Sequence, residues 1–526
     1  MGYNLADLLE SVAAAVPDRE AVVTAAGADG EPERRLTHRQ LDERADRLAH
    51  VLAGFGVGAD DVVGLMLRNG NEYLEGMLAC FKLRAVPANI SYRATAAEVS
   101  SQLDGAGAVA LLHEPELAGV VASAGHLGAT LARGVAWEGA LAAAPAGPVA
   151  VPGRSGDDRY LLYTGGTTGR PKGVVWRHED LFHGALGGGT PDGDGPLTGP
   201  ADLAAAAPTG RARYLPASPF THGTGHWSAL TALLGGGTVV CLREAGFDAA
   251  RMLDVVVAEA VTCLVVVGDA FGRPILEALE GRCDLERMTP LNVILSGGAT
   301  LAPATKTGLL RLLPWAIVVD GFGSSETGGQ GQWVTYPGAP DAVDNRFRMG
   351  ADSVVLDDDH RPLPPGSGRV GWLARRGHLP IGYVGDPEAT RRTFLEVDGV
   401  RWAVPGDRAV QEADGTIVVH GRGSSTINTG GEKVQAEEVE AAVRTHPAVL
   451  DAVVVGVQDE RWGEVVAAVV AVRPGTSVSV EEVAARCGRA LAPHKLPRRL
   501  VVVDEVVRSP SGKPDLRWAR AAASGS

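Results

Sequence analysis

The chain has 526 residues, of which 45% are hydrophobic and 21% are charged, and its formal net charge is −14. This length exceeds the usual size of one hydrophobic core, so two or more domains are expected, and the composition excludes disorder over the whole chain. The acidic balance argues against nucleic-acid binding, because nucleic-acid-binding proteins usually carry a basic face.

The cysteines and the N-terminal segment indicate a cytoplasmic protein. The five cysteines are far apart and form no CxxC pair, which argues against a disulfide framework or a zinc site and favours a reducing compartment. Residues 1–20 lack a positively charged n-region and predict an amphipathic helix instead of a signal peptide. No apolar run reaches the roughly 18 residues of a membrane span, so no membrane-spanning segment is predicted.

Short apolar runs alternate with helical patterns over most of the chain. Amphipathic helices are predicted over 37–56 and 70–87. Buried strands are predicted over 61–67, 159–163 and 293–298. This alternation predicts an α/β architecture with parallel sheets.

Two regions depart from that alternation. Residues 184–212 are rich in Gly, Pro, Ala and Asp, and they predict a long surface excursion. The last hundred residues predict a self-contained α+β domain, in which Ser479 and Glu482 form a capping box at the start of a helix. A boundary near 421 gives a large domain over 1–421 and a small domain over 422–526.

Positions 163–174 read YTGGTTGRPKGV, directly after an apolar stretch. Glycines let backbone N–H groups approach an anion, threonine hydroxyls add donors, and Lys172 adds a positive charge, so the segment predicts a polyphosphate-binding loop. It is not a Walker A loop, because Arg170 and Pro171 separate Gly169 from the lysine. The candidate dinucleotide fingerprint GFGSSE ends in Glu326 where that fingerprint requires glycine.

Six segments, in order, resemble the motifs of the adenylate-forming superfamily, which includes acyl-CoA synthetases, peptide-synthetase adenylation domains and luciferases. They are YTGGTTGRPKGV (163–174), LSGGATLAP (295–303), GFGSSETGG (321–329), PGDRAV (405–410), GRGSSTINTGGEKVQAEEVE (421–440) and RSPSGKPD (508–515). The fifth is most similar to acyl-CoA synthetases of the fatty-acid and steroid side-chain type. The resemblance covers essentially the full chain. It implies a large N-terminal domain of doubly wound α/β subdomains plus a small β-barrel, and a smaller, mobile α+β C-terminal domain.

The resemblance implies binding sites for ATP, Mg²⁺ and coenzyme A. The residues that would hold the β- and γ-phosphates are Thr164, Gly165, Gly166, Thr167, Thr168, Gly169 and Lys172. The residues that would contact adenine, ribose and the α-phosphate are Gly298, Ala299, Phe322, Gly323, Ser325, Asp407 and Arg422. Gly430 and Gly431 would let the pantetheine arm of coenzyme A pass close to the backbone. Ser325 stands where the superfamily usually has threonine.

Three further roles follow from the same resemblance. Glu326 would ligate Mg²⁺, Lys513 would reach the carboxylate and the α-phosphate, and His222 would lie beside the substrate carboxylate. His222 and His226 are four residues apart, a spacing that could place both on a metal if the segment were helical. Gly223 and Gly225 argue against a helix there.

Together these roles predict ATP-dependent adenylation of a carboxylic acid, followed by thioester formation with coenzyme A, as in an AMP-forming acyl-CoA synthetase. An alternative is that another acceptor takes the activated group: a carrier-protein thiol, an amine, or a nitrogen nucleophile such as nitrite. A third reading is a non-catalytic nucleotide-binding scaffold, against which the presence of Lys172, Glu326, Asp407 and Lys513 argues. The sequence does not identify the acid, and the resemblance is consistent with a homodimer.

Overall fold

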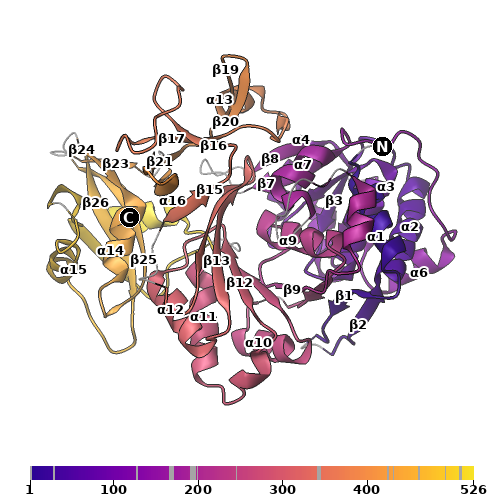
Figure 1. Ribbon diagram of the computed structural model, residues 1–526, viewed down its shortest axis with the longest axis horizontal. Helices are drawn as coiled ribbons and strands as arrows, with labels where there is room; N and C mark the ends of the chain where they lie inside the picture. Colours follow the sequence, from indigo (N-terminus) through magenta and orange to yellow (C-terminus); the bar gives the residue numbers. More distant parts are fainter. Residues whose placement is uncertain are drawn as a thin grey trace. The chain divides into compact units, whose positions relative to one another are not determined.

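The computed structural model describes residues 3–525 apart from 28–29, 126–127, 165–170, 190–196, 198, 245, 340–344, 423–425, 430–431, 460–462, 492 and 509–511. The chain forms two compact units, one of residues 1–342 and 376–403 and one of residues 343–375 and 404–526 (Figure 1). The second unit contains all of 422–526 and two earlier segments, so the boundary predicted after residue 421 stays a prediction.

The first unit contains a sheet whose inner strands run parallel. Its strand order is β14–β13–β12–β11–β9–β10–β1–β2, and the two outer strands, β14 and β2, run antiparallel to their neighbours. The strands are β1 (Glu20–Thr24), β2 (Arg34–Thr37), β9 (Arg213–Pro216), β10 (Thr238–Cys241), β11 (Cys263–Val266), β12 (Val293–Gly297), β13 (Ile317–Ser324) and β14 (Gly328–Thr335). The apolar runs of the sequence become these inner strands, because a parallel sheet is buried on both faces.

A second sheet of the same unit has the order β18–β8–β7–β4–β3–β5–β6. Strands β7, β4, β3, β5 and β6 run parallel, and β8 and β18 are antiparallel additions at one edge. The strands are β3 (Val62–Met66), β4 (Val86–Asn89), β5 (Ala108–His113), β6 (Ala129–Ala132), β7 (Arg159–Thr164), β8 (Lys172–Arg177) and β18 (Gly382–Tyr383). Two parallel sheets in one unit confirm the predicted α/β architecture.

Helices cover these sheets, and α10, α11 and α12 lie side by side along β12 and β13 (Figure 1). The helices of the first unit are α1 (Leu5–Ala15), α2 (His38–Gly54), α3 (Asn71–Leu83), α4 (Ala96–Ala106), α5 (Ala118–Ala124), α6 (Val135–Ala143), α7 (His178–Ala185), α8 (Pro200–Ala206), α9 (Gly223–Leu234), α10 (Ala249–Ala258), α11 (Gly268–Glu280), α12 (Pro303–Leu312) and α13 (Pro387–Thr393). A short hairpin, β19 (Phe394–Val397) and β20 (Val400–Ala403), also belongs to this unit.

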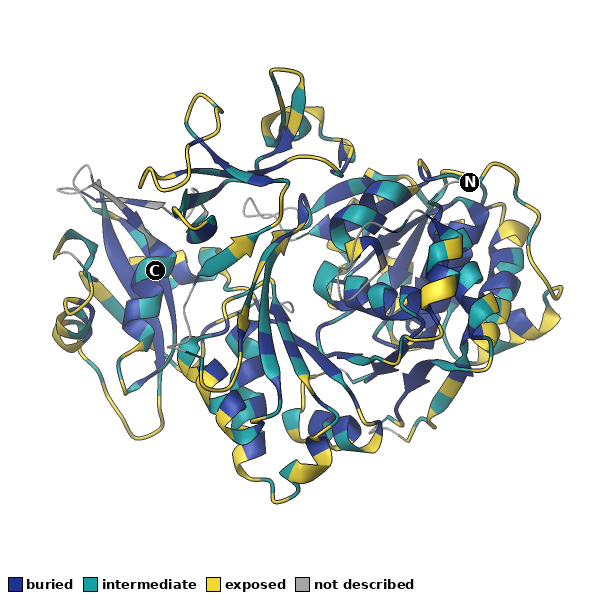
Figure 2. Cartoon of the chain, in the orientation of Figure 1, coloured by how far each residue is buried: buried dark blue, intermediate teal, exposed yellow. Residues whose placement is uncertain are grey.

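The helices predicted over 37–56 and 70–87 are both present as α2 and α3. Helix α2 buries its apolar face, as the sequence predicts, and the structure shows in addition a capping box formed by Thr37 and Gln40 at its start. Helix α3 differs from the prediction because all of its residues are buried, polar ones included (Figure 2). Its polar residues remain satisfied inside the unit: Lys82 pairs with the carboxylates of Glu10, Asp42 and Asp46.

The glycine-rich segment 184–212 is more ordered than the sequence predicts. Helix α7 runs to Ala185, and Pro200–Ala206 forms α8, which buries Leu203. Arg19 donates hydrogen bonds to the carbonyl oxygens of Ala207 and Gly210, at 2.7 and 2.5 Å. The described part of the segment is therefore partly helical, because alanine favours helix, while Ala201, Ala205 and Ala206 stay exposed as expected of a surface segment. Residues 190–196 and 198 lie outside the described residues.

The second unit is rich in antiparallel strands. One group pairs in the order β16–β17–β21–β22–β15, and a separate sheet pairs in the order β24–β23–β26–β25 with β27 beside β26. The strands are β15 (Arg346–Met349), β16 (Ser353–Leu356), β17 (Gly371–Arg375), β21 (Asp407–Gln411), β22 (Thr416–Arg422), β23 (Thr426–Thr429), β24 (Glu432–Gln435), β25 (Val449–Asp459), β26 (Gly463–Val472) and β27 (Arg499–Val503). The small β-barrel stays a prediction, as does the mobility of the C-terminal domain.

Three helices complete the second unit: α14 (Ala436–Arg444), α15 (Val480–Cys487) and α16 (Leu516–Ser524). Alternate valines of β25 and β26 face two cores, one shared with α14 and α15 and one shared with α16. Ser479 and Glu482 form the predicted capping box at the start of α15. The α+β character predicted for the end of the chain is confirmed.

The composition also led to predictions about the cysteines and about membrane-spanning segments. Cys80, Cys241, Cys263 and Cys487 are buried and Cys283 is exposed, and all five are free thiols. Among the described residues, no helix combines the length and the hydrophobicity needed to cross a bilayer.

Candidate active site

The two ends of the glycine- and threonine-rich loop lie on one β-hairpin. Strands β7 and β8 pair antiparallel, and Thr164, the last residue of β7, lies opposite Lys172, the first residue of β8. Residues 165–170, which include Gly165, Gly166 and the other central residues of the predicted loop, lie outside the described residues. The hairpin places both ends of the loop at the carboxyl edge of the parallel strands, where open α/β sheets bind ligands.

A buried amide fixes the base of this hairpin. Asn89, the last residue of β4, accepts a hydrogen bond from the N–H of Tyr163 at 2.6 Å and donates to its carbonyl oxygen at 2.9 Å. The same amide donates to the carbonyl oxygen of Thr221 at 2.6 Å. Asn89 therefore joins the base of the loop to the segment that leads into His222.

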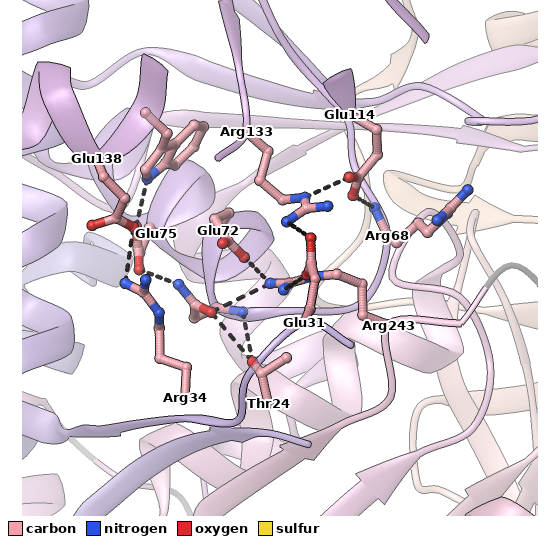
Figure 3. Close-up of polar contacts among 12 residues, drawn as sticks. Thr24, Glu31, Arg34, Arg68, Glu72, Glu75, Glu114, Arg133, Glu138 and Arg243 are labelled. Carbon is pink, nitrogen blue, oxygen red and sulfur yellow. Dashed lines mark hydrogen bonds and ion pairs between the residues drawn. The ribbon is translucent and has the colours of Figure 1, made fainter. Parts of the chain in front are cut away.

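A network of charged side chains lies beyond the carboxyl ends of strands from both sheets of the first unit (Figure 3). Arg243, which follows β10, pairs with Glu72 at the start of α3. It also pairs with Glu31, and the distance from its Nη1 to the Glu31 carboxylate is 2.7 Å. Glu31 also pairs with Arg133 at 2.7 Å, and Arg133 pairs with Glu114 at 2.5 Å. Because these residues follow or precede strands of both sheets, the network holds the two sheets together.

The turn between β13 and β14 carries the predicted Glu326. The N–H of Ser324 donates to the hydroxyl of Thr327 at 3.0 Å, and the N–H of Glu326 donates to the hydroxyl of Ser324 at 3.2 Å. A Cβ atom at Gly323 would overlap the carbonyl oxygen of Gly328, so this position requires glycine. The turn is therefore a compact structure that fixes the backbone of Glu326.

Two aromatic side chains tie this turn to the hairpin. The hydroxyl of Tyr383 donates to Oε1 of Glu326 at 2.9 Å, and Nζ of Lys172 lies 5.0 Å from the centroid of the Tyr383 ring. Trp176, on β8, donates from Nε1 to the carbonyl oxygen of Ser325 at 3.0 Å. Lys172 and Glu326, which are far apart in the sequence, thus lie on two sides of one tyrosine.

The surroundings of Glu326 fit a Mg²⁺ ligand. Its side chain is buried, and within the described residues no arginine, lysine or histidine pairs with its carboxylate. The described part of the chain also contains no cluster of three or more His, Cys, Asp or Glu side chains suited to a metal. Mg²⁺ commonly takes one or two carboxylates from a protein and its other ligands from phosphates and water, so one buried carboxylate is sufficient here.

The predicted adenine-side residues lie at the carboxyl ends of β12 and β13. Gly297 and Gly321 are partners in the parallel pairing of these strands. The following Gly298 has a φ of 85°, a conformation that favours glycine, and the hydroxyl of Thr224 lies 3.5 Å from where its Cβ would be. Phe322 follows Gly321 directly, so Phe322 and the turn at Gly298 belong to neighbouring strand ends. Ala299 follows in the same turn.

The segment from His222 to Leu234 corrects one prediction. A helix, α9, begins at Gly223, although two glycines in its first turn argue against it. Gly225 is accommodated because a Cβ there would overlap the carbonyl oxygen of Pro219, so tight packing requires glycine and outweighs its low helix propensity. His222 is the half-buried residue that precedes this helix.

His226 belongs to the core of the first unit. Its Nδ1 lies 2.6 Å from the carbonyl oxygen of Phe220, and its Nε2 is hydrogen-bonded to the hydroxyl of Tyr160. Trp227 donates to the same hydroxyl at 3.2 Å. Burial lowers the pKa of His226 to about 4, so the ring is neutral. With both ring nitrogen atoms occupied, His226 is not available to share a metal with His222.

The remaining predicted residues belong to the second unit. Asp407 is buried at the start of β21 and lies opposite Arg422 of β22 in the antiparallel register. Lys513 is exposed in the loop between β27 and α16. Gly430 and Gly431 lie outside the described residues.

Asn89, Trp176 and Tyr383 were not predicted from the sequence. Asn89 and Tyr383 have no motif around them that indicates chemistry, and Trp176 lies just beyond the end of the motif at 163–174. Their roles depend on contacts with distant segments, such as the bond from Tyr383 to Glu326.

Comparison with known proteins agrees with this arrangement. A family model described as AMP-binding enzyme matches residues 9–381, and a model described as AMP-binding enzyme C-terminal domain matches residues 438–513. The chain belongs to the AMP-binding enzyme family. The sequence-based resemblance to adenylate-forming enzymes is confirmed.

Similar AMP-binding enzymes cover nearly the whole chain. A 3-oxocholest-4-en-26-oate–CoA ligase from Rhodococcus rhodochrous is 41% identical over 99% of this chain and 96% of its own length. The medium-chain acyl-CoA ligase Mig from Mycobacterium avium is 40% identical over 98% of each chain. Among solved structures, ATP-bound MatB from Rhodopseudomonas palustris has a TM-score of 0.82 and 25% identity, and the match covers 99% of both chains.

Proposed function

We propose that this chain is an AMP-forming acyl-CoA synthetase. In the first step a carboxylate oxygen attacks the α-phosphorus of ATP, the bond to the β-phosphate breaks, and acyl-AMP and pyrophosphate form. In the second step the sulfur of coenzyme A attacks the acyl carbon, AMP leaves with the bonding electron pair, and the thiol proton passes to solvent. The products of the whole sequence are an acyl-CoA thioester, AMP and pyrophosphate.

The observation that carries this proposal is the placement of Lys172 and Glu326 on two sides of Tyr383. A triphosphate needs a cation beside its terminal phosphates and an oxygen ligand for its metal, and this arrangement offers both within one unit. Mg²⁺, when bound, would supply positive charge that offsets the negative charge developing on pyrophosphate. Glu326 is the residue proposed to hold it.

Other residues are assigned by their motifs. We assign the phosphates to the loop from Thr164 to Lys172, adenine to Phe322 with Gly298 and Ala299, and the ribose to Asp407 with Arg422 nearby. The hydroxyl of Ser325 is assigned to the α-phosphate, and Gly323 keeps its turn tight. These assignments rest on motif order and on the strand ends described above. In the predicted division into domains 1–421 and 422–526, these residues fall in the large domain, apart from Arg422.

Three assignments concern the acyl group and its transfer. Lys513 is proposed to contact the carboxylate and the α-phosphate during adenylation, where an ammonium group stabilises developing negative charge. His222 is proposed to lie beside the carboxylate, because it directly precedes α9, whose Thr224 lies next to the turn at Gly298. Gly430 and Gly431 are proposed to border the path of the pantetheine arm.

The names of the relatives indicate which acids to test first. Those relatives are named for a steroid-derived acid and for medium-chain acyl groups. We therefore propose a large apolar carboxylic acid as the substrate, either a medium- to long-chain fatty acid or an acid on a steroid side chain. A homodimer and a cytoplasmic location stay predictions.

A panel of carboxylic acids tests the proposal. Each acid is incubated with the full chain, ATP and Mg²⁺, and pyrophosphate release is measured without and with coenzyme A, while the product is weighed by mass spectrometry. The proposal predicts acid-dependent pyrophosphate release and a product with the mass of the acyl-CoA. Pyrophosphate release without any thioester would indicate a carrier protein or another nucleophile as acceptor. No pyrophosphate with any acid would favour a non-catalytic scaffold.

A further inference from the structure

Arg508 closes the loop that carries Lys513. Its Nη1 donates to the carbonyl oxygen of Gly512 at 2.9 Å, and its backbone forms an antiparallel bridge with Pro514. Gly512 has a φ of 76°, which glycine adopts without strain, so the chain turns sharply just before the lysine. The residues on both sides of Lys513 are therefore held by one arginine.

Asp451 fixes the orientation of that arginine. The carboxylate accepts from Nε of Arg508 at 2.9 Å and from Nη2 at 2.8 Å, which is a bidentate pair. A bidentate pair fixes the plane of the guanidinium group, so Nη1 can point only toward the loop. Burial by itself would raise the pKa of Asp451, but the hydrogen bonds and charge of Arg508 outweigh it and lower the pKa.

Asp451 is itself anchored in the core of the second unit. Its carboxylate accepts from the N–H of Ala452 at 2.8 Å and lies 3.6 Å from Nε of Arg444 on α14. Arg444 donates to the carbonyl oxygen of Ala452 at 2.6 Å and pairs with the buried Glu440 at 3.3 Å. The chain of contacts from α14 through β25 to Arg508 thus connects the backbone at Gly512 and Pro514 to the core of the unit.

We propose that Arg508, oriented by Asp451, is a positioning residue that presents Lys513 for the adenylation step. The inference rests on the proposed function, because Lys513 has this task only in an enzyme that forms an acyl-adenylate. A lysine side chain is long and flexible, so holding the backbone at Gly512 and Pro514 in advance reduces the entropy lost when the ammonium group of Lys513 meets the reacting atoms. Arg508 acts through the loop and touches neither substrate.

The two half-reactions test the inference separately. Arg508→Lys keeps the charge but cannot reproduce the three hydrogen bonds, and Asp451→Asn weakens the bidentate pair. We expect both variants to lower the rate of carboxylate-dependent pyrophosphate release about tenfold to hundredfold, the cost of a small misplacement of a catalytic group. Thioester formation from preformed acyl-AMP and coenzyme A should be unchanged. Equal losses in both half-reactions would show a merely structural role and overturn the inference.

Hydrogen exchange of the full chain gives a readout that does not depend on activity. Peptides that cover 505–516 should exchange faster in Arg508→Lys than in the wild type, while peptides from β25 and β26 should not change. Arg520→Gln, which changes an exposed arginine of α16, is the matched control and should behave as wild type in every measurement. Unchanged exchange over 505–516 would overturn the inference.

A wild type that releases no pyrophosphate overturns the proposed function, whereas fully active Arg508 variants overturn this inference alone.

Discussion

Tyr383 donates a hydrogen bond to Glu326 and places its ring beside Lys172, so one side chain contacts two residues with separate proposed tasks. The hydroxyl restricts the orientation of the Glu326 carboxylate, and the ring attracts the lysine ammonium group through its quadrupole. These two contacts can be removed in succession, because phenylalanine removes the hydroxyl and keeps the ring, whereas leucine removes both.

Removal of the tyrosine hydroxyl should weaken the use of Mg²⁺. In Tyr383→Phe the Glu326 carboxylate loses its hydrogen-bond donor, so we expect adenylation to slow about tenfold and to require more Mg²⁺ for half-maximal rate. Tyr383→Leu should in addition raise the KM for ATP, because Lys172 loses the ring. Titration of pyrophosphate release with Mg²⁺ and with ATP measures both effects. Tyr336→Phe, at an exposed tyrosine, is the control, and an unchanged Mg²⁺ dependence in Tyr383→Phe would contradict the assignment.

Loss of the lysine in the final loop should impair one half of the reaction. Lys513→Ala should slow adenylation about 100-fold to 1,000-fold, by analogy with the loss of a donor to a developing oxyanion. Because Lys513 is exposed, its removal should leave the thermal unfolding midpoint unchanged. Separate assays of pyrophosphate release and of thioester formation from acyl-AMP measure the two halves. Normal acid-dependent pyrophosphate release in this variant would exclude the proposed role.

The charged network in Figure 3 should contribute to stability. Arg243→Ala leaves the buried carboxylate of Glu72 without its main counter-charge, which we expect to lower the free energy of unfolding by about 3 to 5 kcal/mol. The exposed pair of Arg311 and Glu280 provides the contrast, and Arg311→Ala should cost less than about 1 kcal/mol. Urea unfolding measures both. An equal loss of unfolding free energy in Arg243→Ala and Arg311→Ala would show that the network contributes no more stability than an exposed ion pair.

Buried neutral histidines should make the fold sensitive to acid. Burial lowers the pKa of His38, His178 and His226 to about 4, below the ordinary value near 6.5. Between these values the unfolded chain binds more protons, so the free energy of unfolding falls as the pH falls from about 6.5 to about 4, by up to about 1.4 kcal/mol per pH unit for each histidine. Urea unfolding at several pH values measures the slope.

A single substitution tests that account. His226→Gln should make the pH dependence shallower, whereas His494→Gln, at a partly exposed histidine of the second unit, should leave the slope as it is. A slope in His226→Gln equal to that of the wild type would mean that other groups cause the acid sensitivity.

The sequence predicts those features whose signal is local. The apolar face of α2 and the capping box of Ser479 and Glu482 each depend on residues a few positions apart, and both are found as predicted. Helix α9 was missed because the packing of Gly225 against Pro219 outweighs the low helix propensity of glycine, and a single-residue propensity contains no such contact.

The candidate site shows the same limit. Lys172 and Glu326 were predicted because each lies in a motif with a distinct chemical pattern. Tyr383 was not predicted, because its contacts with both residues arise from the pairing of β18 with β8 and from the position of the β13–β14 turn. Arg508 lies inside a predicted motif, but its partner Asp451 is in another strand and has no local signal.

The most direct measurement follows the oxygen atoms of the carboxylate. A substrate acid labelled with ¹⁸O in both carboxyl oxygens is incubated with the enzyme, ATP, Mg²⁺ and coenzyme A, and AMP and the thioester are analysed by mass spectrometry. If the carboxylate attacks the α-phosphorus, each turnover places one ¹⁸O atom in AMP and leaves the other in the thioester carbonyl. Label in inorganic phosphate, or a thioester formed together with unlabelled AMP, would contradict the account.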